Sequence, residues 1–309
     1  MQNPFCRSKK MLKANQGLIL GLLGVSLFAL TLPLTKIVVA AIGIYETTFL
    51  RSTLTGIIAL AFLIITRSSI PKTAYELRLL FPIIVSIGLG FPIGTAYAMQ
   101  YLPPGQGGVV LGLTPLLTAI YGAYISRQRL PFPFWVATFF GFLVISFYSL
   151  IKNNWQFSHG EIGLLIASIS AAIGYSKAGM LSKSMDSRDV ISWVMATSLV
   201  FNAPLVYFFA GNDVNVLTEN LMQPKILIAF LLLSVITMYI ANFFWYKGLS
   251  LGGVANVSQI LFLQPLITLF YSAFFWDEEI QVSDYVAIAL ILAIIVYSSR
   301  NRSITVKNQ

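Results

Sequence analysis

Apolar runs, each bounded by charged residues or by breaks that contain glycine or proline, follow one another along the whole chain. A run of about 18–25 such residues is long enough to cross a hydrocarbon core roughly 30 Å thick as a helix, whereas strands of an outer-membrane barrel alternate over segments of about ten residues. The pattern predicts ten transmembrane helices, at 17–40, 46–66, 77–101, 105–125, 132–151, 160–181, 190–210, 224–247, 252–276 and 282–299. We therefore expect an all-α integral membrane protein.

Composition strengthens this interpretation. The chain has 309 residues, of which 57% are apolar and 10% are charged, whereas soluble domains average about 45–50% apolar and about 25% charged residues. Ten spans of this length leave only short loops, so the sequence has no room for a soluble catalytic or nucleic-acid-binding domain. The net charge of +9 must then be explained within a membrane protein, and we expect no nucleic-acid partner.

The cations are distributed unevenly between the two predicted sides of the membrane. Most lysines and arginines fall in segments on the side of the N-terminus, whereas Lys36, Lys152 and Lys225 fall on the other side. Because basic loops face the cytoplasm, we expect a multi-pass plasma or inner membrane protein with both termini cytoplasmic. Residues 1–16 and 301–309 would be cytoplasmic tails, and the first apolar run is too long for a cleaved signal peptide.

Two halves of the sequence repeat each other. Gly21-Leu22-Leu23 in the first predicted helix matches Gly163-Leu164-Leu165 in the sixth, and Pro115-Leu116-Leu117-Thr118 in the fourth matches Pro265-Leu266-Ile267-Thr268 in the ninth. We expect a first five-helix repeat at 17–151 and a second at 152–300. Since five is an odd number, the second repeat would be inverted, an arrangement that recurs in secondary transporters. A duplication kept only for packing is the alternative.

The loops that follow the two proline helices agree with this inversion. Ser126–Arg129 is basic and would lie inside, whereas Trp276–Glu279 is acidic and would lie outside. Two related halves of opposite orientation can exchange conformations, which would open a shared central site first to one side and then to the other.

Several segments resemble the EamA family of the drug/metabolite transporter superfamily. They are Glu46–Arg51, Tyr97–Tyr101, Leu113–Leu116, Leu263–Leu266 and Trp276–Glu279. The resemblance covers roughly residues 17–300 and implies ten helices arranged as two inverted repeats of five. It also implies a carrier, with amino acids and related zwitterions or amines as the first substrates to consider.

Three residues are expected to have gating or structural roles. Pro115 and Pro265 each lack the N–H that a helix needs and would bend their helices near mid-membrane. Arg51 lies within a span, where a charge is expensive and usually faces the bundle interior or a water-filled cavity. It would attract a carboxylate or phosphate, pair with Glu46 or Tyr45, or extend its head group to the interface.

Polar and aromatic side chains within the spans are candidates for lining a central substrate site, namely Thr31, Tyr97, Tyr175, Trp245, Gln259 and Gln264. Amides and hydroxyls would bind a zwitterion, and ring faces would hold apolar or cationic groups. The alternatives for each are a hydrogen bond between helices, a place in an interfacial aromatic belt, or simple packing. Asn202 and Asn242 raise the same choice.

The sequence lacks the residue sets of an enzyme. His159 is the single histidine and lies in a short loop, no aspartate falls within a predicted span, and no P-loop pattern is present. We expect no catalytic residues, no metal site and no cofactor. The expected function is alternating-access transport of a small polar or amphipathic metabolite by a monomer or homodimer in contact with membrane lipids. A flippase for a lipid-linked substrate and a small channel are the alternatives.

Overall fold

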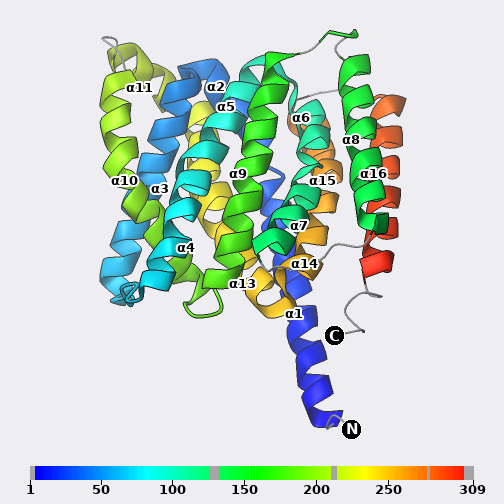
Figure 1. Cartoon of the computed structure of the whole chain (residues 1–309). Coiled ribbons are helices and arrows are strands. Elements are labelled where there is room, and N and C mark those ends of the chain that lie inside the picture. Colours follow the sequence, from blue (N-terminus) through cyan, green and yellow to red (C-terminus); the bar gives the residue numbers. More distant parts are fainter. Residues whose placement is uncertain are drawn as a thin grey trace.

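The computed structural model describes residues 4–125, 132–152, 154–156, 158–209, 214–276 and 279–302, and within these ranges the regular structure is entirely helical. The helices lie side by side as an upright bundle, and the first turns of α1 extend beyond one end of it (Figure 1). The predicted all-α class is therefore confirmed for the described residues.

The first part of the bundle runs to residue 152. Its elements are α1 (Pro4–Phe28), α2 (Thr31–Ile42), α3 (Ile44–Thr66), α4 (Ala74–Val85), the π-helical η1 (Ser86–Gly90), α5 (Phe91–Tyr101), α6 (Pro104–Leu111), α7 (Thr114–Ile125) and α8 (Phe132–Lys152).

The second part follows a short loop. Its elements are α9 (His159–Leu181), α10 (Ser187–Phe209), α11 (Val214–Met222), α12 (Pro224–Leu231), the π-helical η2 (Leu232–Ile240), α13 (Ala241–Gly252), α14 (Val254–Val257), the 3₁₀-helical η3 (Ser258–Leu263), α15 (Gln264–Trp276) and α16 (Val282–Arg302). The sequence pattern did not predict α11.

Seven helical stretches among the described residues are long and apolar enough to cross a membrane. They are 15–42, 44–66, 74–101, 104–125, 159–181, 187–209 and 224–252, and shorter apolar helices occur at 139–152, 260–274 and 282–294. Each of the ten predicted spans thus coincides with an apolar helical stretch, and the protein is a multi-pass membrane protein. That all ten cross the membrane as two inverted repeats stays a prediction.

Several predicted helices are not continuous. The span expected at 17–40 is interrupted between Phe28 and Thr31, and the span expected at 105–125 is interrupted at Gly112 and Leu113. The span expected at 252–276 is divided among α14, η3 and α15. In the third and eighth spans, wider π-helical turns interrupt the α-helix at η1 and η2, and such turns occur frequently at functional sites. Of these changes, the sequence analysis predicted only the bends beside Pro115 and Pro265.

The first and last described residues, Pro4 and Arg302, lie at the same end of the bundle (Figure 1). We call this the terminal end and the other the opposite end. The expected cytoplasmic tails fall partly outside the described residues, at 1–3 and 303–309. Positions 126–129 and 277–278, which carry most of the charge argument, also lie outside them.

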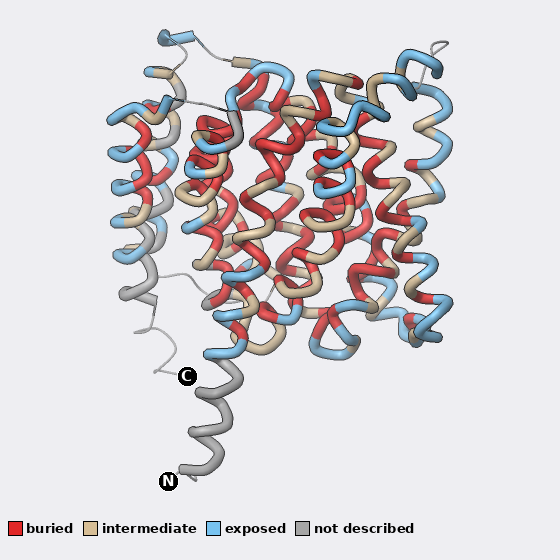
Figure 2. Tube along the Cα trace, turned by 180° about the vertical axis from the view of Figure 1, so that it is seen from behind, coloured by how far each residue is buried: buried red, intermediate tan, exposed pale blue. Residues whose placement is uncertain are grey.

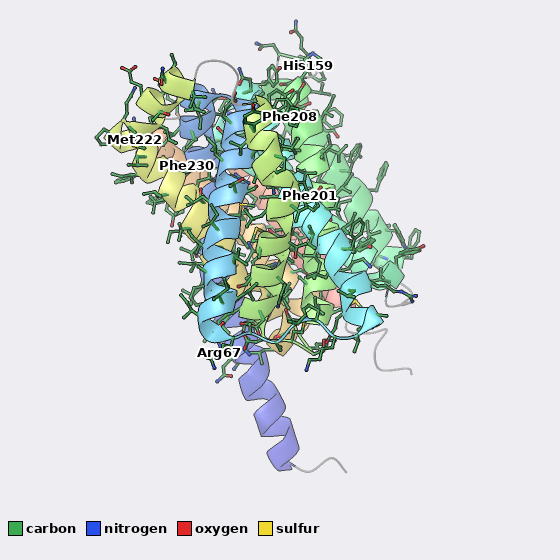
Figure 3. All side chains as sticks on the ribbon, turned by 90° about the vertical axis from the view of Figure 1, so that its left-hand side faces the viewer. Arg67, His159, Phe201, Phe208, Met222 and Phe230 are labelled. Carbon is green, nitrogen blue, oxygen red and sulfur yellow. The ribbon has the colours of Figure 1, made fainter. Side chains whose placement is uncertain are left out.

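Exposed residues lie on the perimeter of the bundle and include many large apolar side chains, whereas the buried residues form a band through its centre (Figure 2). On the face made by α3 and α10, Phe208 is 76% exposed and Ile65 is 80% exposed. Figure 3 shows that Phe208 lies near the opposite end and Phe201 midway on this face, while Arg67 lies at the terminal end. Extended exposed apolar surfaces mark contacts with lipid or with another protein, and in a multi-pass membrane protein this surface fits a hydrocarbon environment.

Close glycine contacts hold two helix pairs together. A Cβ on Gly17 would collide with the backbone of Gly252, which joins α1 to α13, and a Cβ on Gly94 would collide with the backbone of Gly163, which joins α5 to α9. Small residues let membrane helices approach closely enough for backbones to touch. The pairs α1–α13 and α5–α9 are therefore packed backbone against backbone.

Candidate functional site

The first span is broken beside a proline. Pro33 has no N–H, so the carbonyl of Ala29, four residues earlier, loses its partner within the helix. The hydroxyl of Thr268 on α15 donates to this carbonyl at 3.1 Å. Thr31, a predicted site residue, begins α2 directly after the break and is buried. The Ala29 carbonyl thus accepts a hydrogen bond from α15, which is far away in the sequence.

The fourth and ninth spans change conformation ahead of their prolines. Before Pro115, the N–H groups of Gly112 and Leu113 bond to carbonyls three residues back, at 3.0 and 3.2 Å, and α7 begins at Thr114. Before Pro265, the 3₁₀-helical η3 ends and α15 begins at Gln264. Both prolines are buried in the first turn of a new helix, where the missing N–H costs least.

Another polar contact joins the fourth span to the sixth. Thr114 donates its hydroxyl to the hydroxyl of Ser168 on α9 at 3.2 Å, and both side chains are buried. The breaks in the first and fourth spans are therefore both adjacent to hydroxyl contacts between helices.

Three aromatic rings meet beside the break in the first span. The rings of Phe28 and Tyr175 stack with centroids 5.9 Å apart, and the ring of Trp245 meets Phe28 at 6.2 Å and Tyr175 at 5.5 Å, edge to face in both pairs. We call Phe28, Tyr175 and Trp245 the aromatic cluster. It brings together two predicted site residues, and it connects α1, α9 and α13.

Unpaired polar atoms adjoin the aromatic cluster on α13. Asn242, Trp245 and Tyr246 are buried, and they share one face of α13 because they are spaced three and four residues apart. The Asn242 amide oxygen, the Trp245 indole N–H and the Tyr246 hydroxyl have no hydrogen-bond partner among the described residues. Buried polar groups are normally paired, so each exception needs an explanation such as a ligand.

Tyr97 lies apart from this group. Its ring contacts that of Tyr101 at 5.1 Å, and Tyr101 in turn contacts the ring of His159 at 6.1 Å. His159 lies at the opposite end of the bundle (Figure 3), and Tyr97 is only partly buried. The structure therefore places Tyr97 with an aromatic group toward the opposite end rather than in the aromatic cluster.

The predicted amide residues have different positions. Gln264 is the first residue of α15, the helix that also carries Thr268, and its side chain is partly buried. The side chain of Gln259 lies outside the described residues. Asn202 is buried on α10 and donates to the carbonyl of Gly88 in η1 at 3.2 Å, while its amide oxygen is unpaired.

Arg51 is buried within α3, with 1% of its surface exposed. Its guanidinium donates to the Thr35 hydroxyl on α2 at 3.3 Å, and its Nε has no partner in the described part of the chain. The side chain is therefore enclosed by protein and does not extend to a membrane surface.

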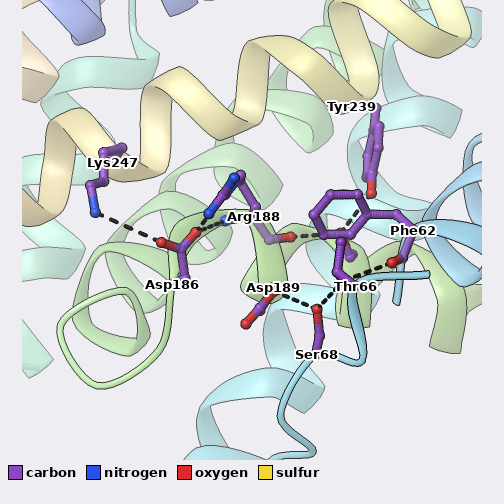
Figure 4. A network of polar contacts seen from close by, with 9 residues as sticks. Phe62, Thr66, Ser68, Asp186, Arg188, Asp189, Tyr239 and Lys247 are labelled. Atoms are coloured by element: carbon purple, nitrogen blue, oxygen red, sulfur yellow. Dashed lines mark hydrogen bonds and ion pairs between the residues drawn. The ribbon is translucent and has the colours of Figure 1, made fainter. Parts of the chain in front are cut away.

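A polar network connects segments from both parts of the chain at the terminal end (Figure 4). Ser68, which follows α3, donates to the carboxylate of Asp189 at 2.8 Å. Asp186 pairs with Arg188 at 3.1 Å and with Lys247 of α13 at 3.9 Å. Partial burial raises the pKa of the Asp186 carboxyl, but the N–H and guanidinium of Arg188 outweigh it and hold that pKa below its ordinary value. We call these residues the terminal network.

Sequence reasoning missed four residues of the site. Phe28 and Tyr246 carry no polar signal that separates them from packing residues in so apolar a chain. Pro33 and Thr268 had a usable signal, because a proline frees the carbonyl four residues earlier and Thr268 belongs to the repeated proline segment. In the described residues, no group of three or more His, Cys, Asp or Glu side chains is placed to hold a metal ion.

Comparison with known proteins gives the family. The sequence model of the EamA-like transporter family matches residues 15–150 and again residues 158–300. The chain is 29% identical over 270 residues to a protein named "Uncharacterized transporter YdeK" from Bacillus subtilis (strain 168), which covers 87% of this chain and 92% of that protein. A solved chain, titled only "Crystal structure of protein", superposes with a TM-score of 0.64 at 17% identity over 92% of this chain and 98% of the other, and so shares the fold.

The family match extends over nearly the whole bundle and includes the broken spans and the aromatic cluster. The resemblance inferred from the sequence is thereby confirmed, and it indicates a membrane transporter of small molecules rather than an enzyme. The chain belongs to the EamA-like transporter family.

Proposed function

We propose that this protein is a carrier that moves a small amphipathic metabolite across the membrane by alternating access. The observation that carries the proposal is the set of three unpaired polar atoms, on Asn242, Trp245 and Tyr246, which lie beside the aromatic cluster and the break in the first span. An indole N–H, a phenol and an amide oxygen together offer donors and an acceptor to a polar head, and the rings offer apolar faces to the rest of a molecule.

The packing of the helices supports an inverted repeat. The second and seventh spans pack against each other as α3 and α10, the fifth and tenth as α8 and α16, and the fourth and ninth as α6 and α15. Two halves related by a pseudo-two-fold axis in the membrane plane pair their equivalent helices in this way. The two separate matches of the family model, and the π-helical turns η1 and η2 in the third and eighth spans, point in the same direction.

The distribution of charge supports an orientation. The terminal end carries the loops that contain Arg67, Lys72, Lys183 and Arg188, and basic loops face the cytoplasm. We propose that both termini are cytoplasmic and that the protein resides in the plasma or inner membrane. In this orientation the terminal network lies on the cytoplasmic side.

The breaks in the first, fourth and ninth spans are the positions at which we propose that the helices bend during transport. A helix that has lost a backbone hydrogen bond bends at lower cost than an intact one, and the first, fourth and ninth spans all carry such a position near their middle. Opening toward the cytoplasm would separate Ser68 from Asp189 and Lys247 from Asp186. We propose that the terminal network closes this side in the conformation described.

Amino acids and related zwitterions or amines are the substrates to test first, because their mixed polarity suits the polar and aromatic residues at the site. Purified protein reconstituted into liposomes is expected to accelerate the flux of at least one of these solutes, with saturation and with competition between solutes. Non-saturating flux would indicate a channel, and transfer of a labelled lipid without solute flux would indicate a flippase.

Matched tyrosine variants test the site itself. Tyr246→Phe removes the buried unpaired hydroxyl, whereas Tyr207→Phe makes the same change at a side chain that is 85% exposed on the outer face of the bundle. We expect Tyr246→Phe to raise the apparent KM about tenfold, which corresponds to a lost hydrogen bond of roughly 1.4 kcal/mol, and Tyr207→Phe to leave the KM unchanged. Equal kinetics in both variants would remove α13 from the site.

A further inference from the structure

Among the residues that the structure describes, no carboxylate forms an ion pair with the buried positive charge of Arg51. Arg51 is one of the largest fully buried side chains among the described residues, and none of the ion pairs formed in that part of the chain includes it. Its Thr35 partner is a neutral hydroxyl, and its Nε has no partner in that part of the chain. A buried charge without a countercharge is unfavourable, so a chain retains one where something else supplies the opposite charge.

The two nearby residues that the sequence suggested as partners are engaged elsewhere. The Glu46 carboxylate folds back over Gly43 at the start of α3, where a Cβ on Gly43 would lie 2.6 Å from Glu46 Oε2. The ring of Tyr45 stacks on that of Phe209 at 4.5 Å. A carboxylate over the first turn of a helix is stabilised by the helix dipole, so Glu46 has its own favourable position and does not neutralise Arg51.

The surroundings of Arg51 are polar but uncharged. Thr55 donates to the Arg51 carbonyl at 2.7 Å and also lies 2.9 Å from the Ser234 carbonyl of η2. Ser52, the next residue on α3, is buried and its hydroxyl has no partner. The guanidinium thus meets a hydroxyl of α2, while the backbone of Arg51 lies beside the Thr55 contact between α3 and η2.

We propose that Arg51 binds the carboxylate of the transported molecule, which assigns the substrate to the class of small amphipathic acids and zwitterions. This inference rests on the transport function proposed above. A guanidinium binds a carboxylate through two parallel N–H···O bonds, and burial strengthens such a pair.

The position of Arg51 fits a molecule that also meets the aromatic cluster. Thr35 follows Phe28 by seven residues along the first span, a separation of about 10 Å at 1.5 Å per residue. Thr35 and Phe28 lie on opposite sides of the break in the first span. The acid group would therefore bind on the side of the opposite end, and the rest of the molecule would reach toward the aromatic cluster and the unpaired polar atoms of α13.

Stability and ligand response together test this proposal. We would measure thermal unfolding of purified wild type, Arg51→Met and the control Arg67→Met, whose side chain is exposed at the terminal end. The probes are L-phenylalanine and L-leucine, each compared with its amide, and also inorganic phosphate and phosphatidylglycerol. Without a probe, Arg51→Met is expected to unfold about 2–4 °C higher than wild type, because it removes an uncompensated buried charge.

With probes, at least one amino acid is expected to raise the unfolding midpoint of wild type and of Arg67→Met, while its amide does not, and Arg51→Met is expected to lose the response. A lower midpoint for unliganded Arg51→Met would show a structural role and overturn the proposal. An equal response to acid and amide, no response to either acid, or a response only to phosphate or phosphatidylglycerol would also overturn it.

Transport separates this proposal from the one on which it rests. If wild type carries a solute with saturation but Arg51→Met carries it equally well, the carboxylate assignment fails and the carrier function stands. If reconstituted wild type shows no saturable flux of any solute, the carrier function itself fails.

Discussion

The first span of the protein and the sixth begin alike and end differently. Gly21-Leu22-Leu23 in the first corresponds to Gly163-Leu164-Leu165 in the sixth, and in this alignment Ala29 corresponds to Ala171 and Pro33 to Tyr175. The first span is broken between Phe28 and Thr31, whereas α9 is unbroken from His159 to Leu181. The broken span thus carries a proline where the unbroken one carries a tyrosine.

The physical reason lies in one N–H group. Tyr175 has an N–H that bonds to the Ala171 carbonyl within α9, and Pro33 has none to offer to Ala29. The freed Ala29 carbonyl binds Thr268 of α15 instead. The comparison shows how related helices acquire separate tasks: the first provides a bend linked to another helix, and the sixth provides a straight wall whose Tyr175 ring packs against Phe28.

The largest effect is expected when the straight helix receives the proline. Tyr175→Pro removes the bond to the Ala171 carbonyl, and no hydrogen bond from another helix reaches that carbonyl in the described part of the chain. We expect the free energy of unfolding to fall by about 3 kcal/mol more than in Tyr175→Ala, which loses the same ring but keeps the N–H. Denaturant unfolding in detergent measures this difference, and equal losses would show that α9 tolerates a break.

The reverse exchange should affect transport more than stability. Pro33→Ala returns an N–H to the first span and lets the Ala29 carbonyl bond within its own helix. We expect flux in liposomes to fall about tenfold, equivalent to a barrier higher by about 1.4 kcal/mol, while the protein remains folded. Flux equal to that of wild type would mean that the bend has no role in the transport cycle.

Two threonines in equivalent proline segments sharpen the comparison. Thr268 donates to Ala29 in another helix, whereas Thr118 donates to Thr114 in its own helix at 2.7 Å. Thr268→Val should therefore destabilise the protein by about 1 kcal/mol, because a buried carbonyl loses its donor, and Thr118→Val should change stability little. Thermal unfolding of the two variants measures this difference, and an equal loss of stability in both would contradict the prediction.

The smallest effect is expected from acid at the terminal network. The pKa of Asp186 lies below its ordinary value in the folded protein, so its contribution to stability is present above the ordinary pKa of an unfolded carboxyl, about 3.9, and is lost as the pH falls through the folded pKa. Since Asp186 is 38% exposed, we expect less than about 0.5 kcal/mol. Asp186→Asn should remove this part of the pH dependence of the unfolding free energy. If the variant and wild type lose stability equally as the pH falls, Asp186 makes no such contribution.

The sequence predicted the positions of the apolar stretches well, because each needs a sustained run of apolar residues that few other folds tolerate. It predicted the breaks less well. Pro115 and Pro265 were recognised through their repetition, but Pro33 was passed over although it follows the same rule. The π-helical turns η1 and η2 had no signal in the pattern, since they depend on packing between helices that are distant in the sequence.

The candidate site was predictable only in part. Tyr175 and Trp245 were expected at the site and meet in the aromatic cluster, whereas Tyr97, equally aromatic and at a similar place in its span, lies toward the opposite end. Residue type suggests which side chains suit a ligand, but the rotation and depth of each helix decide which of them meet. Those follow from close contacts such as Gly94 against Gly163, which one sequence does not specify.

Accessibility of the break from each side of the membrane tests the central claim most directly. Cys6 is the only cysteine, so Thr31→Cys in a Cys6→Ser background places one thiol at the buried start of α2. In oriented vesicles, a membrane-impermeant maleimide is added on one side or the other. Alternating access predicts that the thiol at position 31 is modified from either side; modification from one side only, or from neither, would contradict the account.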